Sequence, residues 1–358
     1  MKKFNFSAGP AMLPKEVMLK AQEEFADYQG TGHGILELSH RGPQFDEVIK
    51  KTEANIRELM NISDDYAVTF IQGGASMQFC MIPMNIMKPG GFAQYADTGQ
   101  WSAKAAKEAK RFGEVKEIAS SKGTNYDRIP VIRHWKPEAE ASYIHITSNN
   151  TVAGTQYRSF PEVDVPLVAD MSSDIMSRVI DVNQFGIIYA GAQKNLGPSG
   201  VALVIIRKDL LERTPKDTPT MLNFDTYVSK SSMFNTPPTF SIYMLGLVTE
   251  WLKAKGGIAA IEEINDAKSE ALYELIDRSE FYRSPLEAGS RSKMNVVWRL
   301  PNEELEAKFV KEAAAAGLSG LKGHRSVGGC RASIYNAMPL EGVETLIDFM
   351  IEFEKNNS

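Results

Sequence analysis

The segment GIIYAGAQKNLGPSGVALVII, from Gly186 to Ile206, decides the expected fold. Two apolar runs, 186–189 and 201–206, flank a turn of mostly small residues that contains Lys194. Neither run alternates apolar and polar residues, and this is typical of strands covered by other elements on both faces. The segment therefore indicates two interior strands of a helix-covered sheet, joined by a turn that carries one lysine.

The same pattern extends toward the N-terminus. Apolar strand-like runs alternate with helical segments from about residue 66 to 207. Such alternation predicts an α/β domain with a mostly parallel sheet and right-handed crossovers. The other strands expected here lie at 66–71, 92–96, 143–147 and 167–169, and one of the helices lies at 102–111.

The alternation of strand-like and helical segments ends after residue 207. A proline-rich stretch at 208–238 predicts an irregular connection, and two long helical segments follow at 240–255 and 258–278. The remaining chain reads as strand, helix, strand, helix, at 295–300, 302–316, 331–335 and 340–354. We therefore expect an N-terminal arm at 1–15, a large α/β domain at 16–255 and a small C-terminal α+β domain at 256–358.

Composition excludes several classes of function. The 358 residues include 40 Lys and Arg against 45 Asp and Glu, a formal charge of −5, which disfavours a nucleic-acid partner. Cys80 and Cys330 have no metal-ligand spacing, so no metal site is expected. No apolar run has the length of a membrane span or a signal sequence. We expect a cytoplasmic protein with no membrane partner.

Three features at the ends of expected strands could carry chemistry. Asp170 follows the run 167–169, Lys194 lies in its glycine-rich turn, and the junction 72–78 (QGGASMQ) opens a helix. Each also has an ordinary interpretation: a turn-capping carboxylate, a solvated surface lysine, and a helix capped by Ser76. Ligands of open α/β sheets bind beyond the carboxyl ends of the strands, and this favours a functional interpretation.

Together the three features suit pyridoxal 5'-phosphate. This cofactor needs a lysine that forms a Schiff base, an acid that pairs with the pyridinium nitrogen, and a phosphate site. Lys194 and Asp170 supply the first two. The free N–H groups and the dipole of a helix N-terminus supply the third.

The chain also resembles the phosphoserine aminotransferase family, which belongs to class V of the fold-type-I pyridoxal-phosphate aminotransferases. The resemblance covers nearly the whole chain. It is carried by five motifs: FNFSAGPAMLP at 4–14, SHRG at 39–42, YAGAQKN at 189–195, MFNTPPT at 233–239, and the run from 322 to 337 that contains KGHR and RASIYNA.

The resemblance implies roles for matching positions around the cofactor. Lys194 would bind the cofactor covalently, Asp170 would pair with its ring nitrogen, Trp101 would stack on the ring and Thr151 would bind the ring hydroxyl. The cofactor phosphate would be held by Ala75, Ser76 and Gln193, and by Asn235 and Thr236 from the other subunit. The family thus implies a homodimer with composite active sites, in which 208–238 is an intersubunit loop.

The resemblance also implies a substrate site. Arg331 would bind the α-carboxylate, and the distal anion would be bound by His40, Arg41, His324 and Arg325, with Ser7 as a further contact. Arginine forks suit both carboxylate and phosphate. Some branches of the family have Gly-Arg where this chain has Ala75 and Ser76, so the distal anion depends here on the other cationic residues.

The implied activity is transfer of the amino group of L-glutamate to 3-phosphohydroxypyruvate, giving O-phospho-L-serine and 2-oxoglutarate by a ping-pong cycle. That reaction belongs to L-serine biosynthesis, and the family also acts on a phosphorylated hydroxy-keto acid in pyridoxine biosynthesis. Three alternatives stay open: a class V aminotransferase of the alanine–glyoxylate type, a cysteine desulfurase, and a catalytically silent pyridoxal-phosphate-binding dimer.

Overall fold

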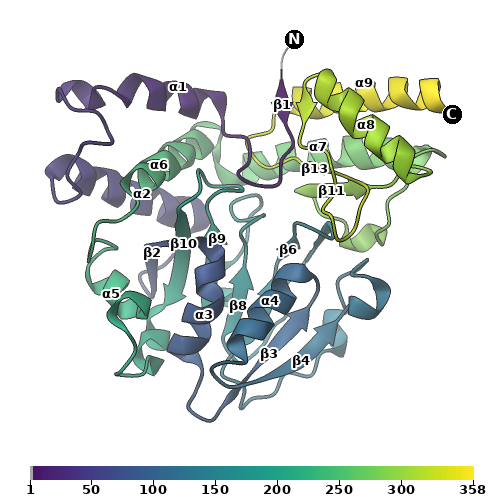
Figure 1. Cartoon of the computed structure of the whole chain (residues 1–358). Helices are drawn as coiled ribbons and strands as arrows, with labels where there is room; N and C mark the ends of the chain where they lie inside the picture. Colours follow the sequence, from purple (N-terminus) through teal and green to yellow (C-terminus); the bar gives the residue numbers. More distant parts are fainter. Residues whose placement is uncertain (1–2) are drawn as a thin grey trace.

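A seven-stranded sheet forms the centre of the large domain in a computed structural model that describes residues 3–358 (Figure 1). Its strand order is β2-β10-β9-β8-β5-β3-β4. The strands are β2 (Tyr66–Gln72), β3 (Phe92–Asp97), β4 (Glu114–Ser120), β5 (Ile144–Thr147), β8 (Leu167–Asp170), β9 (Ile187–Gly191) and β10 (Val201–Arg207). Only β10 runs against its neighbours β2 and β9, so the expectation of a mostly parallel sheet is confirmed.

Helices cover both faces of this sheet, because side chains that alternate along each strand belong to different apolar clusters. In β10, Leu203 and Ile205 pack with the helices α1 (Lys15–Glu24), α2 (Pro43–Met60) and α6 (Thr239–Ala254). Val204 and Ile206 pack with α3 (Gly74–Ile86), α4 (Gln100–Ala109) and α5 (Phe224–Ser229) on the opposite face. Burial on both faces explains why the strands appear in the sequence as continuous apolar runs.

The C-terminal part has its own apolar core, built around Trp298, Phe309 and Phe353. It contains the antiparallel pair β11 (Asn295–Trp298) and β13 (Cys330–Ser333), with α8 (Glu303–Ala315) and α9 (Leu340–Asn357). Helix α7 (Gly257–Arg278) contributes to both cores, since Ile261 belongs to the large cluster and Leu272 to the small one. The domain boundary at 255 remains a prediction.

The N-terminal segment lies against the small domain. Strand β1 (Phe4–Asn5) pairs in parallel with β12 (Leu318–Ser319), and the Phe4 and Phe6 side chains are buried in the small core. This places the start of the chain beside the first turn of α9 (Figure 1). The first two residues of the expected arm lie outside the described part of the chain.

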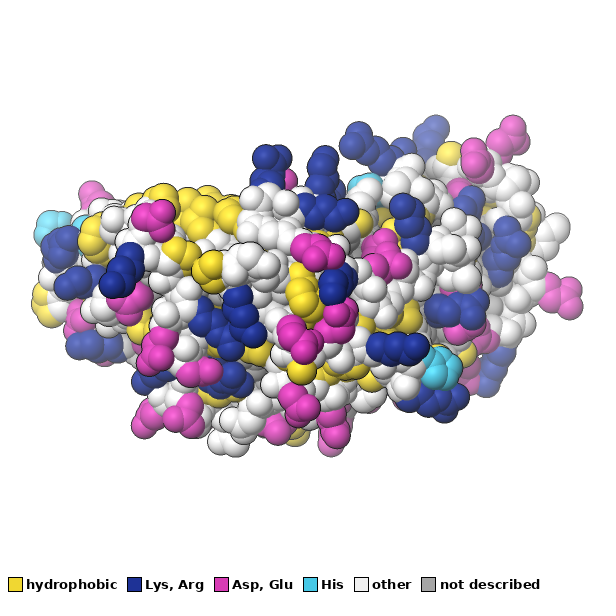
Figure 2. All heavy atoms as spheres, turned by 90° about the horizontal axis from the view of Figure 1, so that it is seen from below, with side chains coloured by type: hydrophobic (Ala, Val, Ile, Leu, Met, Phe, Trp, Pro, Cys, Tyr) yellow, Lys and Arg dark blue, Asp and Glu magenta, His cyan; other side chains and the backbone are white. Residues whose placement is uncertain are grey.

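Short elements complete the structure. β6 (Asn149–Asn150) and β7 (Thr155–Gln156) form a small antiparallel ladder, and the proline-rich stretch contains α5 and the 3-10 turns 208–213 and 220–222. No helix within residues 3–358 has the length and apolarity needed to cross a membrane. On the face shown in Figure 2, basic and acidic side chains are interspersed.

Candidate active site

One edge of the large sheet gathers the candidate residues. Strands β3, β5, β8 and β9 are parallel, so their carboxyl ends lie at the same edge. β2 ends there too, because β10 is antiparallel to both β2 and β9. The residues that follow these strand ends are Trp101, Thr151, Asp170, Lys194 and the first turn of α3. The positions expected for ligands in open α/β sheets are therefore the positions occupied by the predicted residues.

Lys194 points into this edge and is not a solvated surface lysine. Its Nζ donates a hydrogen bond of 2.6 Å to Thr151 Oγ1 and lies 5.7 Å from the centre of the Trp101 ring. Burial lowers the pKa of the Lys194 amine, the Asp170 carboxylate opposes this effect, and the Arg331 cation adds to it. A lysine in such surroundings is more often an unprotonated nucleophile or base than an exposed one is.

Asp170 is buried at the end of β8, with 6% of its surface exposed. Its Oδ1 accepts hydrogen bonds from the Ser172 N–H (3.0 Å) and the Ser172 hydroxyl (2.6 Å). The turn-capping interpretation therefore holds for this oxygen. Oδ2 accepts no hydrogen bond from residues 3–358, so it can receive one from a ligand.

The first turn of α3 exposes backbone N–H groups. Gly73 is the N-cap residue with φ 92°, and a Cβ there would lie 2.9 Å from Met77 Cε, so glycine is required for this turn. No side chain caps the helix, and the interpretation of Ser76 as a cap is wrong. The N–H groups of Ala75 and Ser76 are free of intrahelical acceptors and can bind a phosphate.

Arg331 links the small domain to the site. It lies on β13, and its Nη1 donates a hydrogen bond of 3.1 Å to the Thr151 carbonyl. Its Nε is buried and has no partner among residues 3–358. Burial lowers the pKa of this guanidinium. A half-buried cation without a carboxylate partner is a favourable site for a substrate carboxylate.

His324 and Arg325 approach Arg331 from the loop before β13. Burial lowers the pKa of His324, and the cations Arg331, Arg325 and Lys104 lower it further. Lys104 lies on α4, with its Nζ 4.3 Å from the centre of the Trp101 ring. Several positive groups therefore surround one region next to Lys194, and this arrangement favours binding of an anionic substrate.

Four predicted residues lie apart from Lys194 in the single chain. His40 and Arg41 line a pocket of about 440 Å³ with Met233, and His40 Nε2 is buried without a partner among residues 3–358. Asn235 and Thr236 follow Met233 in the same loop, and Asn235 Oδ1 is likewise buried without a described partner. Among residues 3–358, no hydrogen bond or ion pair joins these four residues to the Lys194 region.

Ser7 and Gln193 lie closer to the site. The N-terminal segment passes over the lysine turn, where the Ala11 N–H donates to the Gln193 carbonyl at 2.9 Å. The Gln193 side chain folds toward Gly191, since a Cβ on Gly191 would lie 2.7 Å from its Oε1. Ser7 lies against Gly320 in the small domain.

Sequence reasoning missed a group of buried polar residues after Asp170. Ser172 fixes Asp170, Ser173 Oγ accepts from the Thr151 hydroxyl at 3.2 Å, and Asp174 accepts from the Ser148 hydroxyl and from Gln156 at 3.1 Å. Burial raises the pKa of Asp174. The run DMSSD at 170–174 could have indicated this group, because polar residues directly after a buried strand require hydrogen-bond partners.

The residues present fit pyridoxal phosphate. They offer an amine with a lowered pKa, an aromatic ring beside it, a buried carboxylate with one open oxygen and free N–H groups at a helix start. The Trp101 Nε1 is also buried without a partner among residues 3–358. Each of these features serves a different part of that cofactor.

Comparison with known proteins identifies the family of this chain. The family model described as "Aminotransferase class-V" matches residues 3–346. A phosphoserine aminotransferase of Desulfotalea psychrophila is 54% identical over 354 residues, covering 99% of this chain and 98% of the relative.

Solved structures show the same likeness. The phosphoserine aminotransferase of Bacillus circulans subsp. alkalophilus has a TM-score of 0.98 at 50% identity and covers 100% of this chain and 99% of its own. The PLP-bound phosphoserine aminotransferase of Trichomonas vaginalis has a TM-score of 0.93 at 36% identity, covering 98% of this chain and 100% of its own. With its class-V match over most of its length and the lysine site at its sheet edge, this chain belongs to the class-V aminotransferase family.

Proposed function

We propose that this chain is a pyridoxal-phosphate-dependent phosphoserine transaminase, which transfers the amino group of L-glutamate to 3-phosphohydroxypyruvate. The observation that carries the proposal is the convergence of Lys194, Asp170 and Arg331 at one sheet edge, with Lys194 Nζ 2.6 Å from Thr151 Oγ1. The identity of about half of all residues to phosphoserine aminotransferases supports the choice of substrates.

Named residues would hold the cofactor. Lys194 would bind it covalently, Asp170 Oδ2 would accept from its ring nitrogen, and Trp101 and Thr151 would contact the ring. Ala75, Ser76 and Gln193 would bind its phosphate. When bound, pyridoxal phosphate supplies an electron sink that stabilises negative charge at the substrate α-carbon.

Lys194 also moves the proton. Its Nζ takes the proton from the α-carbon of the amino donor and returns a proton to the α-carbon of the product. Thr151 Oγ1, 2.6 Å from Nζ, orients the amine for this transfer. Burial, which lowers the pKa of Lys194, keeps more of the amine in the unprotonated form that a general base requires.

Two groups of cations position the substrates. Arg331 binds the α-carboxylate that glutamate and phosphoserine share. His324 and Arg325 bind the distal anion, which is a carboxylate in one substrate and a phosphate in the other. One pocket then serves both halves of the ping-pong cycle, because guanidinium groups pair with either anion. A longer phosphorylated hydroxy-keto acid, as used in pyridoxine biosynthesis, presents the same two anions.

The active form is a homodimer with composite sites. Exposed large apolar side chains occur on α1, shortly after it and in the 230–238 loop: Met18, Leu19, Phe25, Leu36 and Phe234. Asn235 and Thr236 would reach the partner's cofactor phosphate, and His40 and Arg41, which share a pocket with Met233, would reach the partner's distal anion. We place this dimer in the cytoplasm, in L-serine biosynthesis.

Mixing of inactive subunits tests the composite site. Lys194→Ala and Arg41→Ala homodimers should each be nearly inactive, whereas mixed dimers should regain part of the wild-type rate through one intact site. A mixture with no more activity than its components contradicts the sharing of residues between subunits.

The choice of substrates is tested by the amino-acceptor profile of the purified protein. Turnover should be fastest with glutamate and 3-phosphohydroxypyruvate, and faster turnover with alanine and glyoxylate would reverse the assignment. Borohydride treatment followed by peptide mapping should place the cofactor on Lys194. A label on another lysine, or full activity of Lys194→Ala, would refute the assigned role of this residue.

A further inference from the structure

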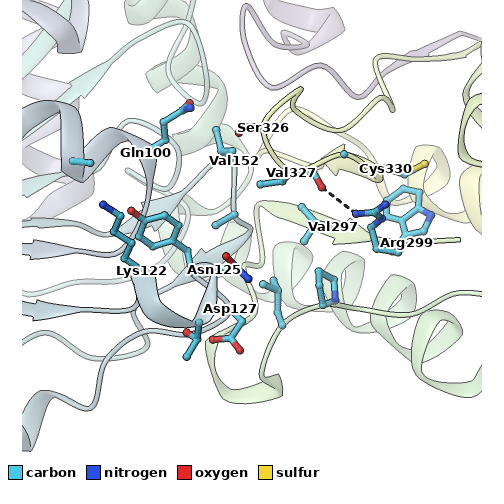
Figure 3. A pocket seen from close by; sticks show the side chains of 18 residues that line it. Gln100, Lys122, Asn125, Asp127, Val152, Val297, Arg299, Ser326, Val327 and Cys330 are labelled. Atoms are coloured by element: carbon cyan, nitrogen blue, oxygen red, sulfur yellow. Dashed lines mark hydrogen bonds between the residues drawn. The ribbon is translucent and has the colours of Figure 1, made fainter. Parts of the chain in front are cut away.

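A pocket of about 770 Å³ lies between the two domains beside the candidate site (Figure 3). The large domain contributes Gln100, which directly precedes Trp101, and Val152, which directly follows Thr151. The small domain contributes Val297 and Arg299 and the loop residues 326–328. The loop that carries His324 and Arg325 thus borders a hollow, and no hydrogen bond joins residues 323–329 to the large domain within the described chain.

The two ends of the loop, at Gly323 and Gly329, are joined by a hydrogen bond. The Gly323 N–H donates to the Gly329 carbonyl at 2.8 Å, and a Cβ on Gly323 would lie 2.0 Å from the Gly328 carbonyl oxygen. Gly328 and Gly329 have φ values of 70° and 69°, which other residues rarely adopt. These contacts between Gly323, Gly328 and Gly329 fix the two ends of the loop. They do not by themselves fix the direction in which residues 324–327 point.

Two side chains of the small domain, Arg299 and Glu306, hold the backbone of the loop. Arg299 Nε forms an ion pair with Glu306 Oε1 at 2.5 Å, and Arg299 Nη1 donates to the Val327 carbonyl at 3.1 Å, the bond drawn in Figure 3. Glu306 Oε2 accepts from the Gly329 N–H at 3.0 Å. Glu306 is 7% exposed, so its pairing with Arg299 is shielded from solvent.

Arg299 also lies along the loop backbone. A Cβ on Gly329 would lie 2.6 Å from Arg299 Cδ, so the chain and this side chain are in direct contact. By contrast, Arg331 is held by its own strand pairing with Val297 in β11. Loss of the Arg299 support would therefore displace His324 and Arg325 while leaving Arg331 in place.

We propose that Arg299 and Glu306 are positioning residues that hold the His324–Arg325 loop at the distance from Arg331 that a substrate with two anions requires. This proposal rests on the proposed function, because it assumes that the loop binds the distal anion. It predicts that the pair acts on selectivity between donors with and without a distal anion, and not on the chemistry common to all donors.

The test is the half-reaction of the cofactor-loaded enzyme with three amino donors, followed by the change in cofactor absorbance. L-Phosphoserine and L-glutamate carry a distal anion, and L-alanine does not. In Arg299→Met, kcat/KM should fall roughly tenfold for the first two, less than the roughly 100-fold that a misplacement of 1 Å can cost. The value for alanine should stay within about twofold.

Two further variants distinguish positioning from general damage. Arg283→Met is the matched control, because Arg283 pairs with Arg299 through the backbone and its side chain has no partner among residues 3–358. Arg299→Lys keeps a charge beside Glu306 but loses the fork that also reaches Val327, so it should show the same selectivity change with full thermal stability.

A double-mutant cycle tests whether Arg299 acts through the loop. In an Arg325→Ala background, Arg299→Met should cost less than about twofold with phosphoserine. Equal losses with all three donors, or no loss in Arg299→Met and Arg299→Lys, would overturn the proposal. A wild-type enzyme that does not use phosphoserine would instead refute the proposed function.

Discussion

Replacement of Arg331 by alanine tests how the site recognises the carboxylate that all its amino-acid substrates share. The structure leaves the Nε–Nη2 edge of this guanidinium free, since Nη1 contacts the Thr151 carbonyl and Nε has no partner within residues 3–358. That edge can form two charge-assisted hydrogen bonds with a carboxylate, worth about 1.5–3 kcal/mol each. Their loss, about 3–6 kcal/mol, corresponds to a fall of roughly 10²–10⁴ in kcat/KM.

The half-reactions with glutamate, phosphoserine and alanine provide the assay for Arg331→Ala. All three donors should lose the same factor, because all three carry the α-carboxylate. Arg331→Lys should recover only part of the loss, since an ammonium supplies the charge without the fork. If alanine kept its rate while phosphoserine lost most of its own, Arg331 would be the ligand of the distal anion, and the two assigned roles would be reversed.

Three other changes have definite expected results. Asp170→Asn should leave the fold intact and lower kcat at least about 100-fold, because a neutral amide cannot stabilise a protonated ring nitrogen as a carboxylate does. A rate near wild type would contradict the pairing of Asp170 with the cofactor ring nitrogen. Reductive methylation of the cofactor-free chain measures the pKa of Lys194, since the pH of half labelling follows that pKa. This pH should be lower in Asp170→Asn, because the Asp170 carboxylate raises the pKa of Lys194, and higher in Arg331→Met, because the Arg331 cation lowers it. Shifts of the opposite sign would contradict this electrostatic account. Lys268→Met should lower the melting temperature, because Lys268 Nζ donates to the carbonyls of Ile334, Tyr335 and Met338 at 2.8–3.0 Å. The difference in melting temperature from the wild type should grow above pH 7, because burial lowers the folded-state pKa of Lys268 to about 7 and the wild type then gains stability as pH rises toward the unfolded-state pKa. An unchanged melting temperature would show that these bonds contribute nothing.

The sequence predicted the buried strands well, including β2 at one edge of the sheet, but it did not predict β4 at the other edge. β8, β9 and β10 are buried on both faces and appear as apolar runs, so their positions were predicted to within one or two residues. β4 lies at the edge of the sheet, and its charged residues Glu114, Lys116 and Glu117 give no apolar pattern. Its place in the sheet is set by pairing with β3, a tertiary contact that a local pattern does not contain.

The candidate site divides in the same way. Lys194 and Asp170 could be predicted because each follows a strand, and a parallel sheet brings strand ends together. The roles of Thr151 and Arg331 required the family resemblance, since neither residue has a local signal. Neither the local sequence pattern nor the family resemblance predicted a role for Arg299 and Glu306. Their proposed role depends on hydrogen bonds to backbone atoms of a loop more than 20 residues later in the chain.

The distribution of charge explains why substrate binding and stability should be coupled in this chain. Asp170 and Asp174 partly balance the Lys194 amine. Arg331 is half-buried and has no acidic partner among residues 3–358, and His324, Arg325 and Lys104 add positive charge nearby. The cost of this unpaired charge is present whenever the site lacks an anion. A ligand with two anions removes more of that cost than a ligand with one. Glutarate, which has two carboxylates and no amino group to transfer, should therefore bind more tightly than acetate and raise the melting temperature more at the same ligand concentration, and the difference should disappear in Arg325→Ala.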